Sequence, residues 1–396
     1  MQAFEFYSPT KIIFGPGTES QVGTQAAAYG ASRVLVVYGG QSAVKSGLLD
    51  RVLSSLSQSG LSYETLGGVR PNPRLSLVRE GLKKALELRA DFLLAVGGGS
   101  VIDTAKAIAD GAANPDLDIW DDIWLQKVTL EKALPVGVVL TIPAAGSESS
   151  NSAVITRDDT KEKRGLGSSF HRPRFAIMNP ELTFTLPPYQ VSCGIVDIMM
   201  HTMDRYFNPI TSNELTDEIA EGLLRTVIRN GRRALEHPGD YQAMSELMWA
   251  GSLSHNGLTG LGGLMDFATH QLGHELSARF DAAHGATLSA MWGSWARYCL
   301  DTNPARFVQF GKRVWGLEDS EKDEKELALS AIEATEAYFR SLNMPTSLSQ
   351  VTGSVQPQEV LEELTRGCTF HGQRTIGTFR VLGHDDILAI YTMANH

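Results

Sequence analysis

Cysteine is scarce in this chain of 396 residues, with three copies far apart at Cys193, Cys299 and Cys368. Three scattered thiols cannot form a disulfide framework or a thiolate zinc cluster. Their scarcity is typical of a protein from a reducing compartment. The chain also lacks an N-terminal basic segment followed by an apolar run, so no signal peptide is visible. We therefore expect a cytoplasmic protein.

Long apolar runs and excess positive charge are also missing. No uninterrupted apolar stretch reaches the roughly 18 residues that a membrane helix needs. The 35 Lys and Arg residues are outnumbered by 45 Asp and Glu residues, which gives a net charge of -10. Because nucleic acids and anionic membrane surfaces select basic patches, we expect neither as a partner. The length is sufficient for two sizeable domains.

The first half of the chain alternates short apolar runs with segments of helical period. The apolar runs cover residues 11–14, 33–38, 91–96, 136–142 and 174–178, and helical segments cover residues 42–57 and 75–89. This alternation predicts an α/β domain with a parallel sheet, over residues 1–188. After two consecutive prolines, long amphipathic helical patterns such as residues 214–235 replace the strand signal. We predict an all-helical domain over residues 189–396.

Residues 91–109, DFLLAVGGGSVIDTAKAIA, are predicted to form a strand, a glycine turn and a helix. Glycines let the backbone approach a bulky anion closely. The free N–H groups at the start of a helix favour phosphate. Ser100 is the expected N-cap, and Asp103 lies in the first turn. The segment matches neither the usual dinucleotide signature nor the P-loop signature. A plain strand-to-helix turn is the alternative interpretation.

Two further segments suit a nucleotide. Gly39, Gly40, Gln41 and Ser42 follow an apolar strand, at a position that commonly faces the adenosine ribose. No acidic residue stands there to repel a 2′-phosphate, so we expect NADPH to be used at least as well as NADH. Residues 141–151, TIPAAGSESSN, follow another apolar strand and offer small side chains and hydroxyls on which a cofactor could lie. An ordinary turn or loop would have a similar composition.

Histidines gather in two segments of the second half. Asp197 and His201 are four residues apart in GIVDIMMHTMDRYF, which places both on one helical face. His270 and His274 have the same spacing in DFATHQLGHELSARFDAAHG, which ends with His284. One carboxylate with several imidazoles is a ligand set for Zn²⁺ or Fe²⁺. Metal binding explains this clustering better than a core of separately satisfied histidines, but spacing alone leaves open whether His270 or His274 is the ligand.

Taken together, these segments are similar to the iron-containing (group III) alcohol dehydrogenase family. The similarity is greatest to its butanol-dehydrogenase and broad-specificity aldehyde-reductase branch. It runs over nearly the whole chain and is most specific in NPELTFTLPPYQVSCGIVDIMMHTMDRYF and THQLGHELSARFDAAHG. The resemblance implies an enzyme, homodimeric and metal-dependent, that transfers hydride between NAD(P)H and small aldehydes or primary alcohols.

The resemblance also implies roles for individual residues. It assigns the metal to Asp197, His201, His270 and His284, and leaves His274 beside the substrate as our candidate proton relay. Asp103, the second candidate catalytic residue, would lie next to the nicotinamide and the substrate pocket. The resemblance makes residues 1–188 the α/β nucleotide-binding domain and residues 189–396 the all-helical metal and substrate domain. From the loops above and from the resemblance, the expected cofactor contacts are Gly39, Gly40, Ser42, Gly98, Gly99, Ser100, Thr141, Ser150, Lys163, Leu182 and Thr185. The chain departs from the branch at Gln41, Ala145 and Ser150, where glycine, threonine and asparagine are often found.

Two other classes of protein stay open. A dehydroquinate-synthase-like or glycerol-dehydrogenase-like enzyme would share this architecture. A cyclising synthase would need clustered cations for a phosphorylated sugar acid, and only Arg205, Arg279 and Arg297 lie near the metal segments. A non-catalytic nucleotide-binding protein would have no need of metal ligands beside a cofactor loop. Net hydride transfer and metal analysis separate these possibilities.

Overall fold

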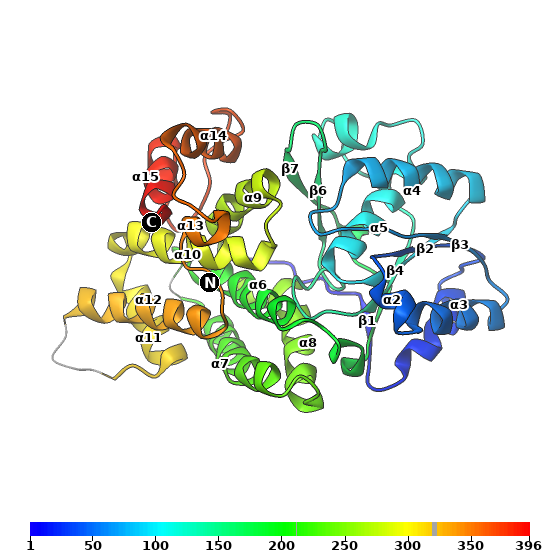
Figure 1. Ribbon diagram of the computed structural model, residues 1–396, viewed down its shortest axis with the longest axis horizontal. Helices are drawn as coiled ribbons and strands as arrows, with labels where there is room; N and C mark the ends of the chain where they lie inside the picture. Colours follow the sequence, from blue (N-terminus) through cyan, green and yellow to red (C-terminus); the bar gives the residue numbers. More distant parts are fainter. Residues whose placement is uncertain (211, 319–322) are drawn as a thin grey trace. The chain divides into compact units, whose positions relative to one another are not determined.

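The structure is a computed structural model that describes residues 1–210, 212–318 and 323–396. The chain forms two compact units (Figure 1). One unit comprises Tyr7–Thr185. The other comprises Leu186–His396 together with Met1–Phe6, so the first six residues do not group with the strand that they precede.

A six-stranded sheet forms the centre of the first unit, in the order β1-β8-β5-β4-β2-β3. Every neighbouring pair is parallel, which confirms the predicted fold class. β4, β5 and β8 are buried along their whole length, as expected for strands covered on both faces. The bounds are β1 Lys11–Phe14, β2 Arg33–Tyr38, β3 Ser62–Leu66, β4 Phe92–Gly97, β5 Val136–Leu140 and β8 Phe175–Met178.

The helices of this unit differ from the expected pattern at one place. The segment 42–57 is two helices rather than one, because Gly47 takes a left-handed conformation (φ 70°) between them. A short antiparallel pair, β6 (Ser152–Thr156) with β7 (Lys163–Gly167), was not anticipated. The helices are α1 Val22–Ala28, α2 Ser42–Lys45, α3 Leu48–Gln58, α4 Leu75–Leu88 and α5 Gly99–Ala113, with short turns η1 Thr18–Gln21, η2 Ile119–Trp124, η3 Ser169–His171 and η4 Pro180–Thr183.

The second unit is helical, as predicted. Within its described residues the only β feature is an isolated bridge between Ile376 and Leu382. In the described part of the chain, no helix combines the length and apolarity needed to cross a bilayer. The helices are α6 Pro188–Tyr206, α7 Glu214–Glu236, α8 Tyr241–His255, α9 Ala268–Phe280, α10 His284–Cys299, α11 Pro304–Trp315, α12 Glu324–Ser341, α13 Leu348–Thr352, α14 Gln358–Cys368 and α15 His384–Ala394, with turns η5 Leu258–Gly260 and η6 Leu300–Thr302.

Helix α6 is the core of the second unit. Every residue from Gly194 to Tyr206 is buried, so the helix is covered on all sides. Pro187 and Pro188 start the helix, since a proline in the first turn gives up no hydrogen bond that the helix would otherwise make. Polar side chains on such a helix must find partners inside the protein.

Candidate metal centre and cofactor cradle

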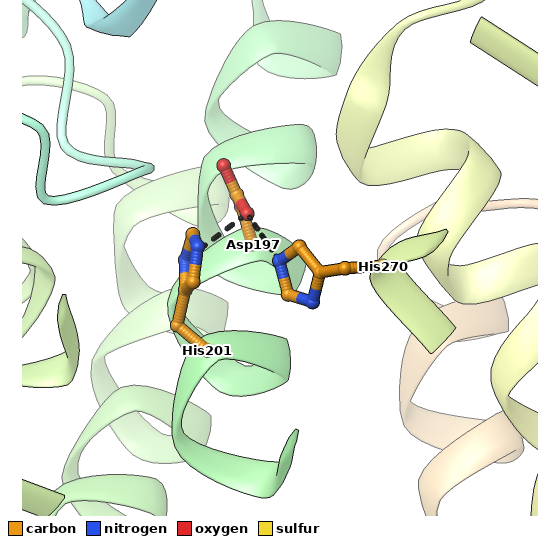
Figure 2. Close-up of side chains that lie close together, drawn as sticks. All are labelled: Asp197, His201 and His270. Atoms are coloured by element: carbon orange, nitrogen blue, oxygen red, sulfur yellow. Dashed lines mark ion pairs between the residues drawn. The ribbon is translucent and has the colours of Figure 1, made fainter. Parts of the chain in front are cut away.

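Asp197 on α6 lies at the centre of a group of imidazoles (Figure 2). Its Oδ1 is 3.3 Å from His201 Nδ1 and 3.8 Å from His270 Nε2 on α9. His284, the first residue of α10, brings its Nε2 to 3.8 Å from the same oxygen. In a tetrahedral site with bonds near 2.1 Å, neighbouring donor atoms are about 3.4 Å apart. The observed spacing therefore suits donors that share one ion.

The donor atoms of Asp197, His201 and His270 also lack hydrogen bonds. Asp197 Oδ1, His201 Nδ1 and His270 Nε2 are buried without a hydrogen-bond partner among the described residues. Leaving such atoms unsatisfied is costly unless a ligand takes them up. Burial, followed by the neighbouring His255 and His270, lowers the pKa of His201 well below its usual value. The imidazole is thus neutral, which is the form that binds a metal. These residues fit a divalent ion.

Asp204, which was not among the residues predicted from the sequence, orients one of these imidazoles. Its Oδ2 lies 2.5 Å from His270 Nδ1, on the ring edge opposite the donor nitrogen. Burial lowers the pKa of His270, but the carboxylates of Asp204 and Asp197 outweigh it and the net shift is upward. A carboxylate at Nδ1 holds the proton there and leaves the Nε2 lone pair for a metal. Asp204 lies seven residues after Asp197 and three after His201, on the same helical face. Extending the pattern by one turn beyond His201 would have found it.

His274 lies beside this group rather than at its centre. Its ring centroid is 5.3 Å from that of His284 and 6.4 Å from that of His270. This placement favours His270 as the ligand of helix α9. A further imidazole, His255 at the end of α8, packs with its ring centroid 3.9 Å from that of His201. His255 has no carboxylate or histidine three or four residues away in the sequence to single it out.

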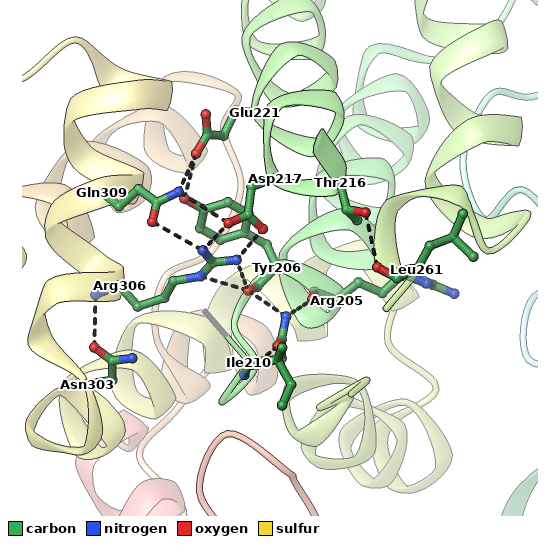
Figure 3. Close-up of polar contacts among 11 residues, drawn as sticks. Arg205, Tyr206, Ile210, Thr216, Asp217, Glu221, Leu261, Asn303, Arg306 and Gln309 are labelled. Atoms are coloured by element: carbon green, nitrogen blue, oxygen red, sulfur yellow. Dashed lines mark hydrogen bonds and ion pairs between the residues drawn. The ribbon is translucent and has the colours of Figure 1, made fainter. Parts of the chain in front are cut away.

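A buried polar network holds the C-terminal end of α6, the helix that carries Asp197 and His201 (Figure 3). The Arg306 guanidinium on α11 makes two hydrogen bonds to the Asp217 carboxylate, of 2.5 and 2.7 Å. It also donates to the Tyr206 carbonyl at 3.0 and 2.7 Å, at a helix end where carbonyls otherwise lack partners. The Tyr206 hydroxyl donates to Glu221 at 2.9 Å. The network stabilises the end of α6, two residues beyond Asp204.

The expected cofactor residues lie mostly at one edge of the parallel sheet. Four neighbouring strands, β8, β5, β4 and β2, run in the same direction. Their carboxyl ends are followed by Leu182 and Thr185, by Thr141, by Gly98–Ser100, and by Gly39–Ser42, respectively. The carboxyl edge of such a sheet is where α/β folds bind their ligands. Segments far apart in the sequence thus form one candidate cradle.

The glycine turn at the start of α5 is tightly packed. A Cβ on Gly98 would lie 2.2 Å from Ile142 Cγ2, so only glycine fits there. The prediction that Ser100 is the N-cap is wrong. Gly98 is the N-cap, Ser100 lies inside the first turn, and no side chain caps the helix. Glycine at position 98 lets the backbone approach Ile142, in the loop after β5, more closely than serine would. Because no side chain caps the helix, its first N–H groups are available to an anion.

Three other expected residues are held by hydrogen bonds within the protein. Asp103 lies beyond the first turn of α5, not in it as predicted. Its carboxylate accepts hydrogen bonds from the Ser147 hydroxyl at 2.6 Å and from the Val154 N–H at 3.0 Å. Burial raises its pKa, with Lys106 opposing that shift. Ser150 is fully buried, and Lys163 donates to Asn72 Oδ1 at 3.0 Å. These side chains support the loops of the cradle from within.

Comparison with known proteins places these features in one family. A family model described as iron-containing alcohol dehydrogenase matches residues 9–180. A second, described as Fe-containing alcohol dehydrogenase family, C-terminal, matches residues 191–395. NADH-dependent butanol dehydrogenase A of Clostridium acetobutylicum is 39% identical over 392 residues, which covers 99% of both chains.

Two further relatives are similar over their whole length. NADPH-dependent aldehyde reductase YqhD of Escherichia coli is 38% identical over 397 residues, and the match covers 100% of each chain. The crystal structure of NADH-dependent butanol dehydrogenase A from Thermotoga maritima superposes with a TM-score of 0.95 at 37% identity, covering 100% of this chain and 99% of that one.

Proposed function

The chain belongs to the iron-containing alcohol dehydrogenase family, and from that membership we propose which of its residues interconvert small aldehydes and primary alcohols. The protein is an NAD(P)H-dependent oxidoreductase of the alcohol dehydrogenase and aldehyde reductase type. The observation that carries the residue assignment is the ring of imidazole nitrogens around Asp197 Oδ1.

Asp197, His201, His270 and His284 hold a divalent ion, Fe²⁺ or Zn²⁺. The support is the buried donor atoms of Asp197, His201 and His270, which have no hydrogen bond, and the Asp204 carboxylate behind His270. His284 Nε2 lies 3.8 Å from the same Asp197 oxygen. When bound, the metal polarises a carbonyl as a Lewis acid, and the nicotinamide supplies the hydride. The chain itself binds and orients these groups, and His274, partly exposed beside His284, is the residue that delivers the proton to the nascent alcohol.

The experiment is a reductase assay on metal-depleted and reconstituted protein. A chelator should abolish aldehyde-dependent oxidation of NADH and NADPH, and Fe²⁺ or Zn²⁺ should restore it. A panel of straight-chain aldehydes from two to about eight carbons would define the substrate range. Full activity in metal-free protein would overturn the ligand assignment. If no aldehyde in the panel supported net hydride transfer, the proposed function would be overturned.

The proposed contacts of the cofactor cradle are Gly39, Gly40, Ser42, Gly98, Gly99, Ser100, Thr141, Leu182 and Thr185. Ser150 and Lys163 support it as buried side chains, which bind Lys106 and Asn72. Gly98–Ser100 would hold the pyrophosphate at the start of α5. Asp103 would keep the loop next to the nicotinamide in place. The exposed Ser42 hydroxyl is the expected side-chain contact for a 2′-phosphate, with the exposed Lys45 as a charge partner. The enzyme should accept NADPH at least as well as NADH.

The protein is also proposed to be a homodimer in the cytoplasm. Residues 1–7 are all exposed, including Phe4 (53%), Phe6 (45%) and Tyr7 (53%). Three large aromatic rings on one short segment are unusual on a monomer and suit burial against a second copy. The three cysteines are unpaired, in keeping with a reducing compartment. Light scattering of the intact chain and of a Phe4→Ser, Phe6→Ser variant would test the dimer.

A further inference from the structure

Lys106, on α5, is an ammonium group placed in the core of the first unit. Its side chain is 0% exposed. A buried charge costs several kcal/mol unless the surrounding groups are arranged to receive it. The stretch of helix that carries it is otherwise apolar, with Ala105, Ala107 and Ile108 equally buried. An uncharged side chain would fill this space at lower cost, so the charge itself needs an explanation.

The Lys106 ammonium is bound by the segment that follows β5. Its Nζ donates to the carbonyl oxygens of Ser147 at 2.7 Å, Ser152 at 2.8 Å and Ser150 at 3.3 Å. The hydroxyls of Ser147 and Ser150 lie at 3.1 and 3.4 Å. An ammonium has three N–H donors and a neutral amine has two. Three convergent carbonyls therefore match the charged form.

Asp103, one turn earlier on the same helix, binds the same segment at two other points. Its carboxylate accepts hydrogen bonds from the Ser147 hydroxyl and the Val154 N–H. Asp103 and Lys106 thus hold residues 147–154 from one face of α5 by both donors and acceptors. Arg172 adds a further contact, donating to the Ser149 carbonyl at 2.7 Å. Three charged side chains, Asp103, Lys106 and Arg172, therefore bind this segment of small residues.

The start of the same helix is the glycine turn of the cradle. Ile142 Cγ2 and Ala145 Cβ, in the loop after β5, would lie 2.2 and 3.2 Å from side chains built on Gly98 and Gly99. Turn and loop are therefore in close contact, with no spare room between them. Because α5 carries both the turn and the two charged side chains, the position of the loop is set relative to the phosphate site.

We propose that Lys106 is a positioning residue for the dinucleotide, which, with Asp103, fixes the loop of residues 141–151 against the Gly98–Ser100 turn. The proposal rests on the proposed cofactor role of these two segments. Loss of the ammonium would let the loop move by a fraction of an ångström to an ångström, and displacements of that size weaken aligned contacts severely.

The test compares Lys106→Met with wild type as metal-loaded enzymes. Methionine keeps most of the side-chain volume and removes the charge. We expect the Kd and KM for NADH and NADPH to rise by about 10-fold to 10²-fold, with a smaller change in kcat. The KM for the aldehyde and the metal content should stay near the wild-type values.

The matched control is Asp110→Asn, one turn further along α5. Asp110 is equally buried and binds His171 Nε2 at 2.8 Å, without touching the loop. It should lower the Tm without changing cofactor affinity at pH 6.5, where Lys106 stays charged even without the nearby Asp110 carboxylate. If Lys106→Met behaves like this control, Lys106 is merely structural and the proposal is wrong. Failure of wild-type protein to bind either cofactor would instead overturn the proposed function.

A second measurement needs no variant. Burial lowers the pKa of Lys106 to about 8, with Asp103, Glu148 and Asp110 opposing that shift and Arg172 adding to it. His171 is the other titratable group in this cluster, through its contact with Asp110. The third N–H donor is then lost as pH rises through about 8, so wild-type affinity for NADH should fall between pH 7 and 9.5. Affinity that stays constant over this range would contradict the proposal.

Discussion

The metal centre and the cofactor cradle are built on different principles. The proposed metal centre takes its side-chain donors from α6, α9 and α10, and each donor is one identifiable residue. The cradle consists mainly of backbone at the carboxyl ends of four strands, where the side chains act by being small. A single substitution should therefore remove a metal ligand outright, whereas it should only reshape the cradle.

The supports behind the two sites differ in the same way. Behind the metal centre, Asp204 contacts a ligand directly, through His270 Nδ1. Behind the cradle, Lys106 and Asp103 hold a loop whose own hydroxyls are largely turned inward. We expect the effects of substitution to decrease in order from a metal ligand, to the neighbouring relay, to the support of a ligand, and finally to the rim of the cradle.

The largest effect is expected for His270→Ala, which removes a ligand and leaves Asp204 without its partner. A polarising metal is worth several kcal/mol to the reaction, so kcat should fall by at least ~10³-fold. Elemental analysis should show loss of the metal. The control is His237→Ala, which changes an exposed histidine of the same unit. This variant should keep both the metal and the wild-type kcat. Stoichiometric metal in the His270 variant would remove this residue from the ligand set.

His274→Ala should have the second largest effect and should separate the relay from the ligands. Its ring lies beside His284 but outside the three residues grouped around one ion position. The variant should keep stoichiometric metal, while kcat falls by about 10²-fold as general acid catalysis is lost. Metal loss in this variant, with metal kept in His270→Ala, would reverse the assignment of the two histidines.

The sequence located most of the candidate metal donors, because helical spacing translates directly into side-chain neighbours. Asp197 with His201, and His270 with His274, were on one face by period alone. Which histidine of α9 faces Asp197 depends on how that helix packs against α6, and no spacing rule contains that information. His255 was missed for the same reason, since it meets His201 only through the packing of α8 against α6.

The cradle was harder to predict, because it depends on backbone conformation and on strand order. The sequence located the Gly98–Ser100 turn but assigned its cap to Ser100, since the closeness of Ile142 to Gly98 is a tertiary contact. β3 was missed because its sequence, SYETL, contains three polar residues and is not a continuous apolar run. It lies at the edge of the sheet, where polar side chains can face solvent. The buried role of Ser150 was hidden because a serine that lines a site and one that binds a buried lysine look alike in sequence.

The third effect should come from Asp204→Asn, which sharpens the comparison by changing only the support of a ligand. Asparagine keeps an oxygen near His270 Nδ1 but removes the negative charge. Metal affinity, measured by competition with a chelator, should fall by about 10-fold to 10²-fold. Glu221→Gln, another buried carboxylate on this unit, should leave the affinity unchanged. Equal affinities in wild type and Asp204→Asn would mean that His270 needs no support.

The smallest effect is expected at the rim of the cradle, from Gly39→Asp. A Cβ on Gly39 would lie 3.7 Å from Val101 Cγ2 and from the Val69 carbonyl, which is ordinary contact, so the aspartate fits. Its charge would oppose the roughly two negative charges of a 2′-phosphate, at about 1 kcal/mol per charge pair in water at 4 Å. After screening by salt, kcat/KM for NADPH should fall about 10-fold, and that for NADH should change little.

Gly39→Asn is the matched control for this prediction, because it has the shape of aspartate without the charge. It should affect the two cofactors equally, because a neutral side chain does not repel the extra phosphate of NADPH. A loss that is equal for NADH and NADPH in Gly39→Asp would mean that the added side chain acts by its bulk. In that case, or if the wild-type enzyme prefers NADH by about 10²-fold, the strand end at Gly39–Ser42 does not face the 2′ position. The cradle would then have to select its cofactor elsewhere, because no acidic residue follows β2 before Asp50.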